Sequence, residues 1–229
     1  MISPETYYEE YLKGKTKEQI MSAIRGLKQE IGRLKNTLEN KILRERQIAE
    51  PSAETRIQCT REYLQRARLA YSEAGGQYQL SKAEEMATDF EANLNAICKI
   101  TLNIGGYFGG YCKYIVEVSD ELSAYKIFWE DKEPFDLINM NEDQLFTKSD
   151  YLLALSELHI GEWRRRYSTE RFGYSVVDGT HWSLEFEYNN GHKFRSFSGD
   201  NSYPYNFGKL ERLFGIEEVL DYEDDEDYR

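Results

Sequence analysis

The spacing of hydrophobic residues changes near residue 97, and this change constrains the fold more than any other feature of the chain. Before it, apolar side chains recur at alternating intervals of four and three residues, as on one face of a helix. The members of this seam are Ile20, Ile24, Leu27, Ile31, Leu34 and Leu38. After residue 97, apolar and polar residues alternate, as on half-buried strands. The sequence therefore predicts an α+β fold with a helical N-terminal arm.

Local signals mark where the arm's helices begin. Ser3 and Pro4 suit a cap and a first helical position, and Thr16 with Gln19 forms a capping-box pattern. The helix that follows Thr16 is expected to continue until Pro51 stops it, because proline disfavours a helical residue before it.

Two further helices are expected at about 52–73 and 80–96. The seam spans nearly three heptads, whereas sustained coiled coils usually need three or four or more. We therefore expect the arm to form a helix hairpin within one chain, so that the protein is a monomer. A homodimeric coiled coil through the arm is the alternative.

The second half of the chain reads as an antiparallel sheet of order βββ-α-ββ-α. The first three strands are expected at about 98–104, 111–119 and 123–130, and the helices at about 147–160 and 206–214. The clearest hairpin turns at Asn190-Gly191, after Trp182, Leu184, Phe186 and Tyr188 on one strand face. We predict a helical arm over 1–96, an α+β domain over 97–220 and an acidic tail over 221–229.

The net charge of −12 belongs to the second half of the chain. Residues 1–96 carry 15 basic and 15 acidic side chains, whereas residues 97–220 carry 13 basic and 20 acidic ones. The tail adds six acids and one arginine. A broad basic surface for nucleic acid is therefore not expected, and direct nucleic-acid binding is the less favoured interpretation.

Composition also indicates a compartment. No apolar run is long enough to span a bilayer, and the N-terminus is acidic where a signal peptide would be basic. The three cysteines have no CxxC spacing, which argues against a disulfide framework or a zinc site. We expect a cytoplasmic protein that makes no membrane contact.

The glycine-rich segment from Gly105 to Tyr111 has the first spacing of a phosphate-binding loop. Tyr111 and Cys112 stand where that loop requires Lys and Ser/Thr. We interpret the segment as a hairpin connection or bulge with two exposed aromatic side chains, Tyr107 and Phe108, available for contact.

The three histidines, His159, His181 and His192, lack the spacing of a zinc-binding helix pair. We expect scattered surface or half-buried histidines, and we expect no metal and no cofactor. A cleft by the sheet that brings His181 together with Asp178 or Cys112 is the enzymatic alternative.

The only basic run is Trp163-Arg164-Arg165-Arg166-Tyr167. Its arginines suit phosphate or carboxylate groups, with the two aromatic residues stacking on bases or guanidinium planes. The run also suits a helix end, where cations favour the negative pole of the dipole. Both interpretations stay open.

Acidic residues are concentrated at 117–143, which holds nine acids and two lysines. The simplest interpretation is a solvated face. The functional alternative is an anionic surface that competes with nucleic acid for a basic groove. Its central candidates are Glu130, Asp131, Glu133 and Asp136.

Two segments carry a resemblance to other proteins. Asp178-Gly-Thr-His-Trp182 and Gly199-Asp-Asn-Ser-Tyr-Pro204, with the turn at Asn190-Gly191 between them, resemble a C-terminal module found in many bacterial proteins of unknown function. That module has a DGTxW strand, a glycine turn and a GxNxYP segment before a short helix. The resemblance covers roughly 97–216 and implies a shared α+β fold, without catalytic residues to carry over.

These observations favour a non-enzymatic protein-interaction module with a basic protein partner. One concrete form is an inhibitor or adaptor of a bacterial nucleic-acid-handling or defence complex, such as a CRISPR-type complex. An enzyme with a site near the sheet, and nucleic-acid binding through Arg164–Arg166, are the alternatives.

Overall fold

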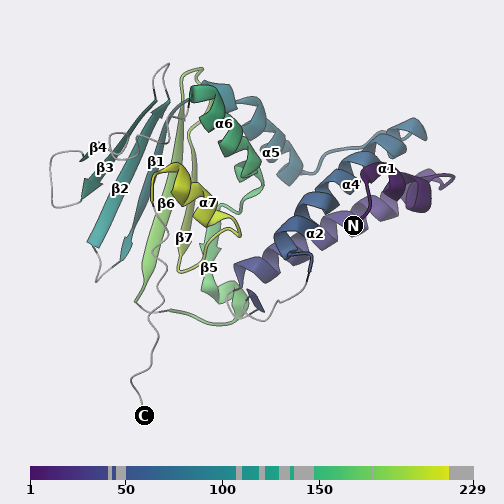
Figure 1. Cartoon of the computed structure of the whole chain (residues 1–229), viewed down its shortest axis with the longest axis horizontal. Helices are drawn as coiled ribbons and strands as arrows, with labels where there is room; N and C mark the ends of the chain where they lie inside the picture. The colour runs from purple at the N-terminus through teal and green to yellow at the C-terminus, as the bar shows by residue number, and fades with distance from the viewer. Residues whose placement is uncertain are drawn as a thin grey trace, which may run out of the picture. The chain divides into compact units, whose positions relative to one another are not determined.

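The computed structural model describes residues 1–40, 43–44, 50–106, 110–118, 122–128, 135–136, 147–176 and 178–216. The chain divides into two compact units, Met1–Lys82 and Ala83–Arg229. The first is helical, and the second is a sheet with its own helices (Figure 1). The α+β class and the helical N-terminal part are confirmed.

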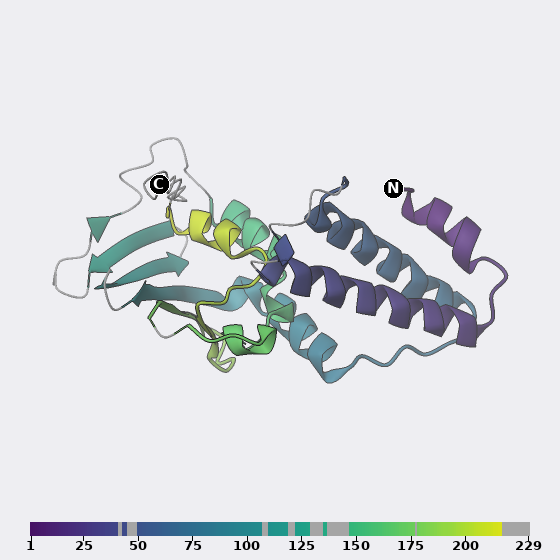
Figure 2. The same cartoon turned by 90° about the horizontal axis from the view of Figure 1, so that it is seen from below.

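Two long helices, α2 (Lys17–Glu39) and α4 (Ala53–Glu73), pack side by side in the first unit (Figure 2). Most of the predicted seam faces α4. The core of this unit comprises Leu12, Ile20, Ile24, Ile31, Leu64, Ala67 and Ala70. The seam therefore packs within one chain as a helix hairpin.

The helix starts follow the predicted caps. The Ser3 hydroxyl accepts a bond from the Thr6 amide at 3.1 Å and opens α1 (Pro4–Tyr7). The Thr16 and Gln19 side chains each accept the other's backbone N–H, at 3.4 and 2.9 Å, so the capping box is complete. Each pair satisfies amides that the first helical turn leaves unbonded.

The end of α2 differs from the prediction. The helix ends at Glu39, and Asn40 adopts an extended conformation, well before Pro51. Asparagine competes poorly as a helix former because its side chain bonds nearby backbone groups, which favours a stop at this position.

The division between the units falls after Lys82, whereas the sequence placed it near residue 97. Helix α5 (Lys82–Ala92) belongs with the sheet, because Phe90 is fully buried there and meets Phe186 edge-to-face at 5.1 Å. A 3-10 turn, Leu94–Ala96, then leads into the first strand. The helical period of α5 gave no indication of which unit its apolar face would join.

Within the described residues, the sheet has seven strands in the order β4-β3-β2-β1-β6-β7-β5. Their bounds are β1 (Ile97–Gly106), β2 (Gly110–Val118), β3 (Leu122–Phe128), β4 (Phe135–Asp136), β5 (Arg166–Ser168), β6 (Thr180–Tyr188) and β7 (Arg195–Asp200). Neighbouring strands are antiparallel except β5, which runs parallel to β7. The predicted order βββ-α-ββ-α was therefore wrong in two details. It lacked the short strands β4 and β5, and the sheet is mixed because of β5.

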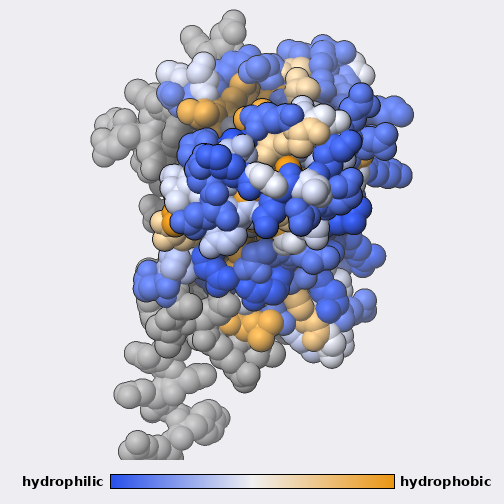
Figure 3. All heavy atoms as spheres, turned by 90° about the vertical axis from the view of Figure 1, so that its right-hand side faces the viewer, coloured by the Kyte–Doolittle hydropathy of each residue, from blue (hydrophilic) through white to orange (hydrophobic). Residues whose placement is uncertain are grey.

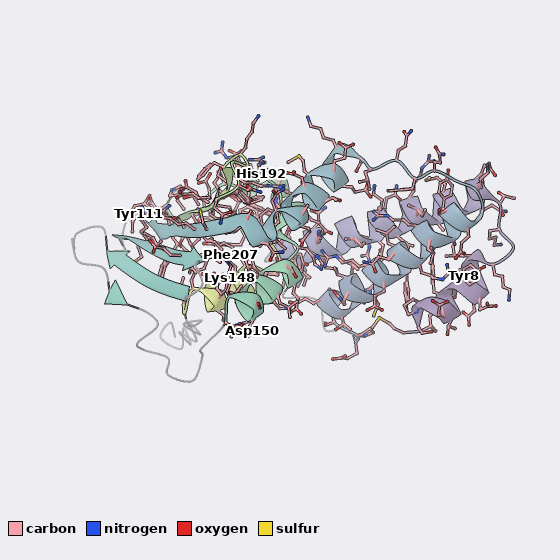
Figure 4. The ribbon with its side chains drawn as sticks, turned by 90° about the horizontal axis from the view of Figure 1, so that it is seen from above. Tyr8, Tyr111, Lys148, Asp150, His192 and Phe207 are labelled. Atoms are coloured by element: carbon pink, nitrogen blue, oxygen red, sulfur yellow. The ribbon has the colours of Figure 1, made fainter. Side chains whose placement is uncertain are left out.

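One face of the sheet is covered by α5, α6 (Lys148–Glu157) and α7 (Phe207–Leu213) (Figure 1). Figure 4 shows Phe207 on this helix-covered side, with Lys148 and Asp150 on α6. The strand residues that face these helices are large and apolar. They include Ile100, Leu102, Tyr114, Val116, Trp182, Leu184, Phe186 and Phe197. This face contains the main core of the molecule.

Arg195 is an exception on the covered face. It lies opposite Phe186 in the register and is buried. Its Nη1 and Nη2 donate to the carbonyl oxygens of Met86 and Gly161, at 2.8 and 3.3 Å, and the guanidinium lies over Phe90. Burial lowers the pKa of Arg195. These bonds fasten α5 and the segment after α6 to the sheet.

The Asp178-Gly-Thr segment has a structural explanation. A Cβ on Gly179 would overlap the Asn201 side chain, so only glycine fits there. The Asn201 amide oxygen accepts the Thr180 N–H at 2.8 Å, and the Asn201 N–H donates to the Thr180 oxygen at 2.9 Å. Asn201 holds a positive φ of 48°, which asparagine tolerates better than most residues. These two hydrogen bonds hold the start of β6 against the end of β7.

On the covered face, Gly199 likewise leaves room for a neighbouring side chain to approach the backbone. A Cβ there would overlap the Ser202 carbonyl oxygen and the Trp182 indole. The indole N–H instead donates to that oxygen at 2.9 Å. Trp182 also stacks on Tyr203 and packs against Phe207 at 4.7 Å. The tryptophan thus joins β6, β7 and α7.

Candidate functional site

The face of the sheet opposite the helices is polar, and we call it the open face. Residues that lie directly opposite each other on paired strands point to the same face of the sheet, so the register defines the members of the open face. They are Lys99, Thr101, Asn103, Tyr111, Lys113, Ile115, Glu117, His181, Ser183, Glu185, Glu187, Ser196, Ser198 and Asp200, with Arg166 and Ser168 from β5. Small hydroxyl and amide side chains lie between the charged ones.

One end of the open face is acidic. Lys99 lies opposite both Glu117 on β2 and Glu187 on β6, and its Nζ is 3.1 Å from the Glu187 carboxylate. Glu185 follows on the same face of β6. Three glutamates thus lie at register positions on the same face as Lys99, and Glu187 contacts it. Glu117 is also the first acid of the predicted acidic segment 117–143.

A polar triad, His181, Asp200 and Arg166, occupies the other end of the open face. The Asp200 carboxylate bonds the His181 Nδ1 at 2.5 Å and accepts from the Arg166 Nη2 at 3.2 Å. These two partners, His181 first, hold the pKa of Asp200 below its usual value. His181 is 54% and Asp200 40% exposed, so the triad is accessible from solvent.

The predicted basic run lies at the edge of the sheet beside this triad. Arg164, Arg165 and Arg166 are exposed, and the Arg165 carbonyl oxygen accepts the Ser198 N–H at 3.0 Å. The run therefore begins at the end of a 3-10 helix, Ile160–Glu162, which Trp163 caps, and leads into edge strand β5.

The aromatic residues of the run point into the core. Trp163 is 7% exposed and packs against Trp182 and Phe197, at 6.4 and 5.9 Å between ring centroids. Tyr167 is 1% exposed, and its hydroxyl oxygen accepts the Arg164 N–H at 3.1 Å. Neither ring is available to stack on a base, so that part of the prediction was wrong.

Glu130, Asp131 and Glu133 lie outside the described residues, as do Tyr107, Phe108 and the tail over 221–229. Asp136 belongs to β4, where its backbone pairs with Tyr125. The acidic segment thus extends the sheet beyond β2.

The proposed catalytic set does not assemble. Cys112 lies on the covered face against the core, whereas the side chain of its neighbour Tyr111 lies on the same face as His181. Asp200, rather than Asp178, is the carboxylate that contacts His181. The chemistry this arrangement offers is a histidine with its Nδ1 engaged by a carboxylate, a pattern that general bases use.

The other histidines are apart from this triad. His192 lies at the turn between β6 and β7, where its Nε2 is 3.2 Å from the Asp89 carboxylate (Figure 4). His159 follows α6 with a positive φ of 49°. Among the residues with described positions, no group of three or more His, Cys, Asp or Glu is arranged to hold a metal ion.

A second surface, which the sequence did not predict, lies in the helical unit. Tyr7, Tyr11 and Tyr63 form what we call the tyrosine column. Tyr7 stacks on Tyr63 at 4.5 Å between centroids, with 8° between ring planes, and on Tyr11 at 5.1 Å and 24°. The Tyr7–Tyr11 spacing of four residues was a signal in the sequence, but the partner ring on α4 was not.

None of the described helices combines the length and the apolarity that crossing a bilayer requires. On the side of the molecule drawn in Figure 3, hydrophobic residues form small separate patches within a mostly hydrophilic surface. Contacts on that side would therefore depend on polar and aromatic groups more than on a large apolar patch.

Comparison with protein-family models, with curated proteins and with solved structures found no match for this chain. The resemblance of the Asp178–Trp182 and Gly199–Pro204 segments to a bacterial module thus stays a prediction. The packing of Gly179, Gly199 and Asn201 accounts for these segments as structural elements of the fold.

Proposed function

We propose that this chain is a non-enzymatic protein-interaction module whose open face binds a partner with a basic surface. The observation that carries the proposal is the open face itself, an ordered surface of four long strands with a glutamate cluster at one end. Rigid strands hold those carboxylates in place, so a partner would bind them without first ordering a loop.

The distribution of charge along the sequence supports a positively charged partner. The acid excess lies in residues 97–229, and the acidic segment that starts at Glu117 continues the sheet through β3 and β4. The glutamate cluster at one end of the open face would attract basic surfaces and raise the association rate.

A specific form of the proposal is an inhibitor or adaptor of a bacterial nucleic-acid-handling or defence complex, for example a CRISPR-type complex. Such a complex contains a basic groove for nucleic acid, and an anionic protein surface would compete for that groove. The chain would act in the cytoplasm. Its three thiols, Cys59, Cys98 and Cys112, are free, which suits a reducing compartment.

The test begins with affinity capture from the native host and then measures binding to the captured partner. The triple variant Glu117→Gln, Glu185→Gln and Glu187→Gln should weaken binding about tenfold at low salt and reduce its salt dependence. Nucleic acid should also displace the partner if the inhibitor form is right.

A matched control removes the same charge from the other side of the sheet. Glu85, Glu91 and Glu157 lie on α5 and α6 and are exposed. Their triple glutamine variant should bind like the wild type. Equal losses in both triple variants, or binding that salt does not change, would refute the open face as the contact surface.

A second candidate function is an enzyme that uses the His181–Asp200 pair as a general base. The observation that favours it is the short hydrogen bond between these side chains at an accessible position. Nucleic-acid binding through Arg164–Arg166 has weaker support, because Arg166 is engaged by Asp200 and the flanking aromatic rings are buried.

A further inference from the structure

We propose that the tyrosine column is a second docking surface, which takes an arginine-bearing segment of a protein partner through the exposed ring of Tyr11. This inference does not depend on the open face, because the column lies in the helical unit, and it can be tested with a defined peptide.

The geometry of the column leaves one aromatic face available. Tyr7 is sandwiched between Tyr63 on one side and Tyr11 on the other, so its ring is half-buried. Tyr11 stands at the end of the stack and is 55% exposed. A flat group can therefore extend the stack on Tyr11 without displacing any residue of the column.

The column is held rigidly from two elements. The Tyr63 hydroxyl on α4 donates to the Ile2 carbonyl oxygen at 2.7 Å, which fixes the N-terminal segment on the long helix. Tyr11 lies in a π-helical turn, Tyr8–Leu12, closed by a bond from the Lys13 N–H to the Tyr8 oxygen at 2.8 Å. Such turns are rare and are frequent at functional sites. Pre-organised tyrosine rings lose little entropy on binding.

The neighbouring ring already shows how an arginine binds here. The Arg66 guanidinium lies 3.7 Å from the centroid of the Tyr8 ring. Its Nε and Nη1 are also 3.3 and 3.5 Å from the carboxylates of Glu5 and Glu73. Stacking on a tyrosine with a carboxylate at the edge is thus the arrangement that this surface uses for its own arginine.

The charged residues around the tyrosine column favour one kind of binding group. Three glutamates, Glu5, Glu9 and Glu10, lie in the first twelve residues. Glu5 is paired with Arg66 at 3.3 Å and Glu9 with Lys13 at 2.6 Å, which leaves Glu10 beside Tyr11 and Glu62 beside Tyr63 as the acids outside these pairs. Glu10 and Glu62 are exposed. This environment repels phosphate and attracts a cation, and a planar guanidinium suits an aromatic face better than a compact ammonium group does.

The experiment compares two synthetic peptides, tetra-arginine and tetra-lysine, by fluorescence anisotropy on the full chain at low ionic strength. The wild type should bind tetra-arginine about threefold more tightly than tetra-lysine, which carries the same charge. Tyr11→Ala should abolish that preference, whereas Tyr11→Phe should keep it, since phenylalanine retains the stacking face.

Tyr174→Ala is the matched control, because Tyr174 is 36% exposed and belongs to the other unit. It should leave both affinities unchanged, and far-ultraviolet circular dichroism should show that all variants keep their helices. Equal affinity for the two peptides, or an unchanged preference in Tyr11→Ala, would overturn the proposal.

The same variant distinguishes two other possible occupants of the tyrosine column. If the wild type forms dimers in sedimentation and Tyr11→Ala does not, the column binds a second copy of the chain and the proposal is wrong. If a single-stranded oligothymidine binds and depends on Tyr11, the column stacks on bases and the proposal is equally wrong.

Discussion

The two faces of the sheet come from the same strands but have opposite chemistry. Glu185 on the open face is next in the chain to Phe186, which is fully buried on the covered face. On the covered face nearly every position is constrained by contact with α5, α6 or α7. On the open face charged side chains such as Glu187, His181 and Asp200 are exposed, so their charges can serve recognition without disturbing the core. This difference suggests that stability and recognition are separated by strand alternation.

The largest expected effect tests this separation at neighbouring positions. Phe186→Ala should destabilise the second unit by about 4 kcal/mol, because it removes a buried ring and leaves a cavity beside Phe90. Glu185→Ala should change stability by less than about 0.5 kcal/mol. Urea unfolding followed by the fluorescence of Trp163 and Trp182 measures both. Similar costs at the two positions would mean that the open face also contributes to the core.

A smaller effect is expected from overpacking the covered face. Gly199→Ala should cost about 2–3 kcal/mol, because the added Cβ would displace Trp182 and the Ser202 carbonyl group. Thermal unfolding followed by near-ultraviolet circular dichroism, which reports on the indole ring, measures this loss of stability. Its control is Ser198→Ala on the open face, which should be close to neutral. A stable Gly199→Ala variant with an unchanged indole signal would contradict the close approach of Trp182.

The smallest effect concerns the polar triad and depends on pH. The pKa of Asp200 is lower in the folded protein than in the unfolded chain, so the carboxylate contributes stability above its unfolded pKa of about 3.9. That contribution is lost as the pH falls through the lower, folded value. Asp200→Asn should therefore be less stable than the wild type near pH 7, and the difference should shrink below about pH 4.

The size of this difference should stay below about 1 kcal/mol, because exposed ion pairs are screened by solvent. Denaturant midpoints at pH 7, 5 and 3 measure it, and Asp178→Asn, another exposed carboxylate, is the control. A difference at pH 3 as large as the one at pH 7 would show that the folded protein does not favour the charged carboxylate of Asp200.

Local patterns were enough to predict much of the fold. The capping box at Thr16, the start of α4 after Ser52 and the hairpin that turns at Asn190-Gly191 depend on residues close together in the chain. The alternation of β6 predicted its buried face, because each strand position has only two sides. Short strands such as β5 have too few residues for such a pattern.

The candidate surfaces were less predictable. The sequence identified Arg166 and His181 separately, but Asp200 was not among the candidates, and only the register of β5, β6 and β7 brings the three together. Trp163 was assigned to a surface because its neighbours are charged, although its ring packs in the core. The tyrosine column likewise needs Tyr63, more than fifty residues away from Tyr7 in the chain.

By itself the sequence determined the two-part organisation, the main helices and strands, and the placement of the excess negative charge. Periodicity, caps and charge are properties of neighbouring residues, so they can be read before folding. The tertiary structure decided where the units divide, which face of each element is covered, and which charged and aromatic groups meet. Those outcomes depend on contacts between distant segments, where the burial of Phe90 or the pairing of Asp200 with His181 is decided by packing of the whole unit.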